Sequence, residues 1–228
     1  MNGSLVVVDD VAKAFAQLVV DAMQSKRSAS FSLAFSGGST ARDCYQELSR
    51  ADSTDIDWAT VTAWWGDERC VPLTDPDSNF RLVQEALLAR VGRLEAVNPM
   101  KSDGEDPAGA YEQLLRASPP IDLIHLGLGP DGHTASLFPG SVALDSPEGR
   151  LVVSNHDPFS NNPHQRLTFT FEAIAQCRQI VVTVAGSGKS DALHRVLDGD
   201  LSAPATHISG AEVTWLVDNA AMGTRTPR

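Results

Sequence analysis

IDLIHLGLGPDGHTASLFPG, residues 121–140, is the stretch that decides the fold. Its apolar first part, residues 121–128, predicts a strand buried on both faces of a parallel sheet. The glycine-rich turn that follows delivers Asp131 and His133 side by side at the end of this strand. Open α/β sheets bind their ligands beyond the carboxyl ends of their strands. An acid beside a histidine at that point is therefore the best catalytic candidate in the chain.

Seven further segments predict strands, namely residues 5–8, 31–35, 61–65, 151–154, 167–171, 180–185 and 213–217. Segments with helical spacing lie between most of them, and the first helix can be capped by Asp9 or Asp10. Strands that alternate with helices indicate the α/β class, with a mainly parallel sheet and helices on both faces. The simplest prediction is a single domain over residues 1–228, to which the middle loops could add a small subdomain.

The chain has 228 residues, of which 42% are hydrophobic and 21% charged, as in ordinary globular proteins. Its formal net charge of −11 argues against nucleic acid or an anionic membrane as a partner. A small anionic substrate is compatible with this charge if the site gathers its own positive side chains. The three cysteines lack paired spacing, and no segment predicts a signal peptide or a membrane span. We therefore expect a cytoplasmic protein, either a monomer or a homodimer.

Two motifs resemble nucleotide-binding loops but lack their context. Residues 127–132, GLGPDG, match a dinucleotide fingerprint, which must lead into a long helix. Pro139-Gly140 would end such a helix after about two turns. Residues 186–190, GSGKS, match only the end of a phosphate-binding loop, because its first glycine would fall at Thr183 inside a predicted strand. Neither NAD(P) binding nor nucleotide hydrolysis is favoured, although Lys189 can still bind one phosphate group.

Residues 35–40, FSGGST, follow a predicted strand and open a predicted helix. Ser36 lies where a nucleophile elbow would place its attacking serine. We favour an anion-binding role for this segment, because backbone N–H groups and hydroxyls at a helix start suit a phosphate. The candidate phosphate ligands here are Ser36, Gly37, Gly38, Ser39 and Thr40.

Four segments together resemble the 6-phosphogluconolactonase family, within the wider glucosamine-6-phosphate isomerase/lactonase group. They are FSGGST at 35–40, WGDERCVP at 65–72, GLGPDGHTASLFPG at 127–140 and AGSGKSDAL at 185–193. DSNF at 77–80 and QRLTFTF at 165–171 add to the resemblance, which covers residues 5–218. Two departures, Ala41 for a common proline and Ser190 for a common alanine, remove no functional group.

The resemblance implies a Rossmann-like three-layer α/β/α sandwich that hydrolyses 6-phosphoglucono-1,5-lactone in the pentose phosphate pathway, with no organic cofactor. No metal is expected either, because the remaining histidines lack metal-ligand spacing. The related amino-sugar phosphate isomerases have a glutamate five residues after the histidine, where this chain has Phe138, and a tyrosine where it has Arg69. These differences favour the lactonase over the isomerase. A sugar-phosphate sensor is a third possibility, but residues 1–30 offer no DNA-binding helices.

A δ-lactone needs an activated water and a stabilised oxyanion. We assign the general base to His133, because imidazole accepts protons near neutral pH, and give Asp131 the role of orienting it. Alternatively, His133 caps a following short helix and Asp131 is a turn residue. Arg69 and Lys189 are the expected positive charges for the phosphate and the oxyanion, and which serves which is open.

Other candidates have supporting roles. Arg166, in a loop before a strand, is a third possible phosphate ligand, and Gly129 and Asp67 are further binding candidates. Asp67 and Glu68 are expected to hold the arginines and their loop rather than to react. The alternatives are an ion pair for Arg69 and a solvated lysine for Lys189. His125 is predicted to be a hydrogen-bonded core residue, and one tryptophan of Trp64-Trp65 to line the pocket rim.

Overall fold

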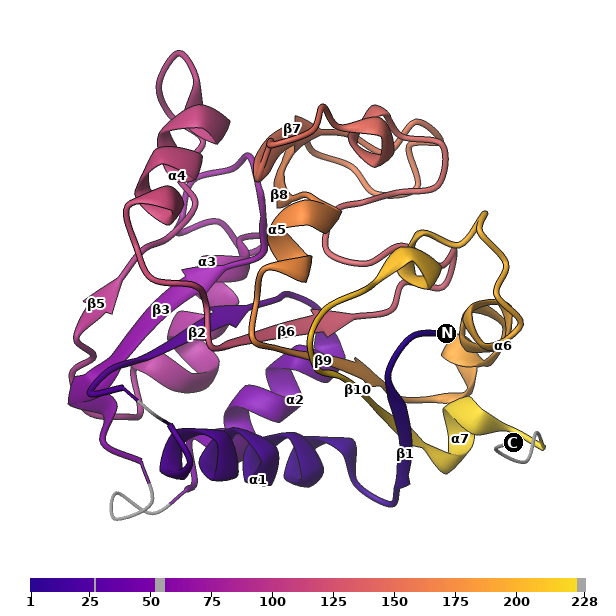
Figure 1. Ribbon diagram of the computed structural model, residues 1–228, viewed down its shortest axis with the longest axis horizontal. Helices are drawn as coiled ribbons and strands as arrows, with labels where there is room; N and C mark the ends of the chain where they lie inside the picture. Colours follow the sequence, from indigo (N-terminus) through magenta and orange to yellow (C-terminus); the bar gives the residue numbers. More distant parts are fainter. Residues whose placement is uncertain (27, 52–55, 225–228) are drawn as a thin grey trace.

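The computed structural model describes residues 1–26, 28–51 and 56–224, and its centre is a seven-stranded parallel sheet (Figure 1). The strand order is β1-β10-β9-β6-β2-β3-β5. The bounds are β1 (Ser4–Val8), β10 (Val213–Asp218), β9 (Gln179–Val184), β6 (Leu123–Gly127), β2 (Phe31–Phe35), β3 (Val61–Trp65) and β5 (Ala96–Val97). The predicted α/β fold with a mainly parallel sheet is confirmed, and the decisive stretch supplies the middle strand.

The chain reverses its direction across the sheet between β2 and β6. After β2 the chain moves outward through β3 to β5, and after β6 it moves the other way through β9 to β10. The segments that leave β2 and β6 therefore diverge at the carboxyl edge and open a crevice between them, which is where doubly wound sheets hold ligands.

Helices cover both faces of this sheet. In the view of Figure 1, α1 (Val11–Gln24) and α2 (Ser39–Leu48) lie below it, and α4 (Pro107–Arg116) and α5 (Phe171–Ala175) lie above it. The remaining α-helices are α3 (Asn79–Val83), α6 (Ser190–Leu197) and α7 (Asn219–Met222). A π-helix, η2 (Gln84–Leu88), continues α3, and short 3₁₀ turns are η1 (Trp58–Thr60), η3 (Val142–Asp145), η4 (Ser187–Lys189) and η5 (Pro204–His207). Asp10, one of the two expected caps, accepts from the backbone N–H of Lys13 at 3.1 Å.

A second, three-stranded antiparallel sheet, in the order β4-β8-β7, lies above the main one (Figure 1). Its strands are β4 (Asp67–Arg69), β8 (Arg166–Phe169) and β7 (Val152–Asn155). The expectation that Arg166 precedes a strand is wrong, because it is the first residue of β8. Its partner across the ladder is Arg69, so two arginines distant in the sequence stand directly opposite each other.

The core contains both tryptophans of the Trp64-Trp65 pair, with 2% and 0% of their surfaces exposed. The prediction that one of them lines the pocket rim is wrong, because the Trp64 ring packs against Tyr111 of α4, with ring centroids 5.8 Å apart, and the Trp65 ring packs against Phe80 of α3, at 5.3 Å. The prediction for His125 is confirmed: its ring nitrogens contact the hydroxyls of Tyr45 at 2.9 Å and Thr183 at 2.8 Å. Burial lowers the pKa of His125 to about 3, so it stays neutral.

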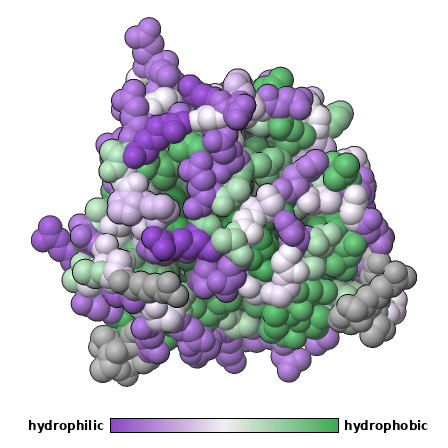
Figure 2. All heavy atoms as spheres, in the orientation of Figure 1, coloured by the Kyte–Doolittle hydropathy of each residue, from purple (hydrophilic) through white to green (hydrophobic). Residues whose placement is uncertain are grey.

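On the face shown in Figure 2, hydrophilic side chains surround smaller hydrophobic patches. The most exposed large apolar side chains in the described part of the chain include Val142, Phe159 and Leu201. Among the described residues, no helix combines the length and the apolar character needed to cross a bilayer. The cytoplasmic location stays a prediction.

Candidate active site

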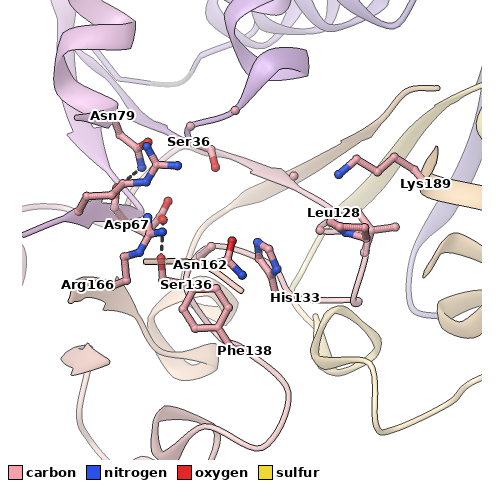
Figure 3. A pocket seen from close by; sticks show the side chains of 17 residues that line it. Ser36, Asp67, Asn79, Leu128, His133, Ser136, Phe138, Asn162, Arg166 and Lys189 are labelled. Carbon is pink, nitrogen blue, oxygen red and sulfur yellow. Dashed lines mark hydrogen bonds between the residues drawn. The ribbon is translucent and has the colours of Figure 1, made fainter. Parts of the chain in front are cut away.

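A pocket opens at the crevice between the carboxyl ends of β2 and β6 (Figure 3). It brings together residues from segments that are far apart in the sequence. Those that line it are Ser36, Gly37, Gly38, Asp67, Arg69, Asn79, Gly127, Leu128, Gly129, Pro130, His133, Ala135, Ser136, Phe138, Asn162, Arg166 and Lys189. Most of the predicted site residues therefore meet in one place.

Hydrogen bonds between its own backbone groups stabilise the turn after β6. The Gly129 N–H donates to the His133 carbonyl at 2.8 Å, and the Gly132 N–H donates to the Gly129 carbonyl at 3.0 Å. From α6, Arg195 donates to the Asp131 carbonyl at 2.9 Å. Residues 128–141 contain no helix, so the alternative in which His133 caps one is wrong. GLGPDG therefore does not lead into the helix that a dinucleotide fingerprint requires.

His133 and Asp131 form a hydrogen-bonded pair. One carboxylate oxygen of Asp131 accepts from the His133 backbone N–H at 3.1 Å and lies 2.6 Å from Nδ1 of the same residue. Because a carboxylate can only accept, Nδ1 carries the proton in the neutral ring and Nε2 keeps its lone pair. The Asp131 side chain thereby fixes the tautomer in which Nε2 is a base.

Burial opposes the ionisation of Asp131, but the hydrogen bonds from His133 outweigh it and lower the pKa of Asp131 below its ordinary value of 3.8. A lowered folded-state pKa stabilises the fold above the unfolded pKa, and this stabilisation is lost as pH falls through the folded value. We expect the free energy of unfolding of wild type to exceed that of Asp131→Asn by a constant amount near neutral pH, and the difference to shrink below pH 3.8. Urea unfolding across pH checks this; a difference that persists unchanged to about pH 3 would contradict it.

Gly129 allows the His133 ring to pack against the turn. A Cβ at position 129 would lie 2.7 Å from Cγ of that ring and closer still to Nδ1. Gly129→Ala is therefore expected to displace the imidazole and lower kcat by about 10²-fold, the usual effect of a misplacement near 1 Å. The control is Gly188→Ala, where a Cβ would meet nothing within 4 Å. Steady-state rates compare the two variants, and equal rates would show that the ring adapts.

Arg69 and Arg166 bring two positive charges to one wall of the pocket. They are cross-strand partners, and Nε of each is buried without a hydrogen-bond partner in the described structure. Burial first, and then the charge of Arg69, lower the pKa of Arg166. Neither forms an ion pair within 4.0 Å among the described residues, so the proposed pairing of Arg69 with Asp67 or Glu68 is wrong. Like charges placed opposite each other are unfavourable unless an anion joins them.

Lys189 faces the pocket from another side, at the end of η4 (Figure 3). Burial lowers its pKa, and the charge of Asp131 offsets this only in part. Lys189 is thus not the fully solvated lysine of the alternative interpretation. It is a third cation at the site without an ion pair in the described structure.

The FSGGST segment divides between the pocket and the helix. Ser36, Gly37 and Gly38 line the pocket, whereas Ser39 and Thr40 form the first turn of α2 and do not line it. Gly37 lies so close to Asn79 that a Cβ would overlap its Oδ1, and Gly38 has a φ of 100°. The predicted cradle is therefore reduced to Ser36 and two glycines whose backbone approaches the site.

The acids next to Arg69 hold loops in place. Asp67 accepts from the Ser136 hydroxyl at 2.7 Å (Figure 3). Glu68 is 1% exposed and accepts from the backbone N–H groups of Asn79 at 2.6 Å and Phe80 at 2.7 Å. The expectation that these acids fix their loop agrees with these contacts: Glu68 connects it to α3, and Asp67 connects it to Ser136. Neither acid forms an ion pair with Arg69 or Arg166 in the described structure.

Four pocket residues with polar or aromatic side chains received no binding or catalytic role from the sequence: Asn79, Ser136, Phe138 and Asn162. Ser136 and Phe138 lie inside the motif that carries His133, so their proximity could have been expected. Asn79 belongs to the DSNF segment. No sequence pattern indicated a role for Asn162, because it lies in a polar loop without periodicity. The described residues contain no group of three or more His, Cys, Asp or Glu side chains that could hold a metal ion.

Comparison with known proteins agrees with this arrangement. The family model for glucosamine-6-phosphate isomerases and 6-phosphogluconolactonase matches residues 5–216. A 6-phosphogluconolactonase of Synechocystis sp. is 38% identical over 205 residues, covering 83% of this chain and 82% of that protein. The crystal structure of the Leishmania guyanensis 6-phosphogluconolactonase has a TM-score of 0.84 at 26% identity and covers 100% of both chains.

A monomeric glucosamine-6-phosphate deaminase shares the fold, with a TM-score of 0.81 at 21% identity over 99% of this chain and 100% of that one. The fold is therefore common to lactonases and deaminases, so the two activities have to be distinguished by the residues of the site. The resemblance inferred from the four motifs is confirmed, and the chain belongs to the glucosamine-6-phosphate isomerase/6-phosphogluconolactonase family.

Proposed function

We propose that the protein hydrolyses 6-phospho-D-glucono-1,5-lactone to 6-phospho-D-gluconate, with His133 as the general base. One observation carries this proposal: an Asp131-oriented imidazole shares a pocket with three cations, Arg69, Arg166 and Lys189, that have no carboxylate partner within 4.0 Å in the described structure. In a chain of net charge −11, such a group of cations suits a phosphorylated substrate.

In the proposed reaction, Nε2 of His133 takes a proton from water while the water oxygen attacks C1 of the lactone. Asp131 stabilises the resulting imidazolium through Nδ1. The tetrahedral oxyanion then collapses, the bond between C1 and the ring oxygen breaks, and His133 returns its proton to that oxygen. Water is the only co-reactant, and the ring-opened acid loses a proton at neutral pH.

The cations divide between the phosphate and the oxyanion. We assign the phosphate to Arg166 and the Ser36–Gly38 backbone. Nε is unpartnered in both Arg69 and Arg166, but Arg166 is the more buried of the two, with 5% of its surface exposed, and a buried guanidinium needs a fixed anion more than a transient one. Arg69 and Lys189 remain available to both the phosphate and the oxyanion. Ser36 needs no nucleophilic role in this mechanism.

The amino-sugar isomerase is disfavoured by what surrounds His133. Phe138 stands where related isomerases are expected to have a glutamate, and its ring centroid lies 5.0 Å from that of His133. Arg166 lies over the other side of the phenyl group, at 5.9 Å from its centroid. An apolar ring at this place provides no acid for opening a sugar ring.

The direct experiment follows acid release at neutral pH from freshly generated 6-phosphogluconolactone, with glucosamine 6-phosphate as the competing sample. Hydrolysis well above the spontaneous rate supports the lactonase. Ammonia release from the amino sugar would identify an isomerase instead. Binding of 6-phosphogluconate without any turnover would identify a sensor.

A further inference from the structure

Asn162 lines the pocket and is held in place by the buried carboxylate of Asp157. It lies in the loop between β7 and β8, and its amide stands beside His133 and Ser136 (Figure 3). Nothing in the proposed hydrolysis uses it. The loop carries Phe159 with 66% of its surface exposed, so apolar packing of that side chain does not hold the loop down.

Asp157 holds Asn162 in place through hydrogen bonds. Its carboxylate is 4% exposed and accepts from the Asn162 backbone N–H at 2.9 Å, from Asn162 Nδ2 at 2.8 Å and from the Phe159 N–H at 2.9 Å. Burial opposes the charge, but these hydrogen bonds outweigh it and lower the pKa of Asp157. Asp157 is thus a carboxylate at neutral pH.

This charge settles which way the Asn162 amide points. A carboxylate accepts only, so the NH₂ group must face Asp157, and the carbonyl oxygen Oδ1 is turned away from it. At the other end of the loop, His164 Nε2 lies 3.0 Å from Asp77 Oδ2, and Arg166 donates to the Pro163 carbonyl at 3.1 Å. Polar contacts at both ends therefore hold one amide oxygen at the pocket.

We propose that Oδ1 of Asn162 accepts a hydrogen bond from a ring hydroxyl of the lactone and so determines specificity for the hydroxylated sugar. The proposal rests on the proposed function, which places the phosphate at Arg166 and the reacting carbonyl at His133. The part of the sugar between these two groups carries hydroxyls, which need acceptors. The cationic side chains that dominate the pocket can only donate, so acceptors for these hydroxyls have to come from the other side chains that line it, and Asn162 Oδ1 is one of them.

The test combines enzyme variants with substrate variants. Wild type, Asn162→Ala and Asn161→Ala are assayed on 6-phosphogluconolactone and on its 2-, 3- and 4-deoxy counterparts. Asn161 is the matched control, because it is the exposed neighbour and does not line the pocket. We expect Asn162→Ala to lower kcat/KM on the full substrate by about 10- to 100-fold, as when one buried hydrogen bond is lost. On one deoxy substrate the loss should disappear.

Asp157→Asn should reproduce this substrate-dependent loss in weaker form, because it frees the amide to turn. An equal loss by Asn162→Ala on all four substrates, or no loss on any, would overturn the proposal, since a structural role does not distinguish hydroxyls. Wild type inactive on every lactone would instead overturn the proposed function. The two failures are therefore distinguishable in one set of assays.

Discussion

Replacing His133 by alanine is expected to lower kcat for 6-phosphogluconolactone by about 10²- to 10⁴-fold, the range that a positioned general base contributes. The reason lies in the 2.6 Å contact between His133 Nδ1 and Asp131, which leaves Nε2 as the base facing the pocket. KM should change little, because the cations that hold the phosphate are untouched. The loss would therefore fall on the chemical step.

The measurement is acid release above the spontaneous hydrolysis rate, at substrate concentrations that give kcat and KM separately. His156→Ala serves as the matched control, because His156 is exposed and does not line the pocket. Circular dichroism should show both variants folded. Activity of His133→Ala within a few-fold of wild type would keep the substrate but remove His133 from the base role.

The strand-turn core of this site was predictable because its signals are local. An apolar run, a glycine turn and the Asp131–His133 pair all fall within residues 121–140, and the observed β6 occupies the expected place. The order of the strands was not predictable, because the neighbours of β6 come from segments near residues 33 and 180. Periodicity reports which faces are buried and carries no information on which strands pair.

Periodicity could not predict the second sheet either. β4 has only three residues, too few to display alternation, and its pairing with β8 joins segments almost a hundred residues apart. The opposed arginines follow from that pairing. Asn162 was missed for a related reason: its position depends on the buried carboxylate of Asp157, and a loop sequence does not reveal which acid will be buried.

Arg166→Met is the second large effect that we expect. Methionine keeps much of the apolar bulk against Phe138 and removes the charge, so the pocket wall is retained. Loss of charge-assisted hydrogen bonds to the phosphate should lower kcat/KM on the phosphorylated lactone by about 10- to 100-fold, mainly through KM. Hydrolysis of unphosphorylated gluconolactone should stay unchanged, because that substrate has no group for Arg166 to hold.

Arg178→Met is the control for loss of a positive charge elsewhere, since Arg178 pairs with Asp122 at 3.3 Å near the amino ends of the strands. Arg178→Met should leave kcat/KM on both lactones unchanged. If Arg166→Met instead lowers kcat equally on both lactones, the guanidinium stabilises the oxyanion and Arg69 or Lys189 must hold the phosphate. The unfolding temperature gives an independent readout. Inorganic phosphate should raise it for wild type by relieving the repulsion between the cross-strand arginines, and should raise it less for Arg166→Met.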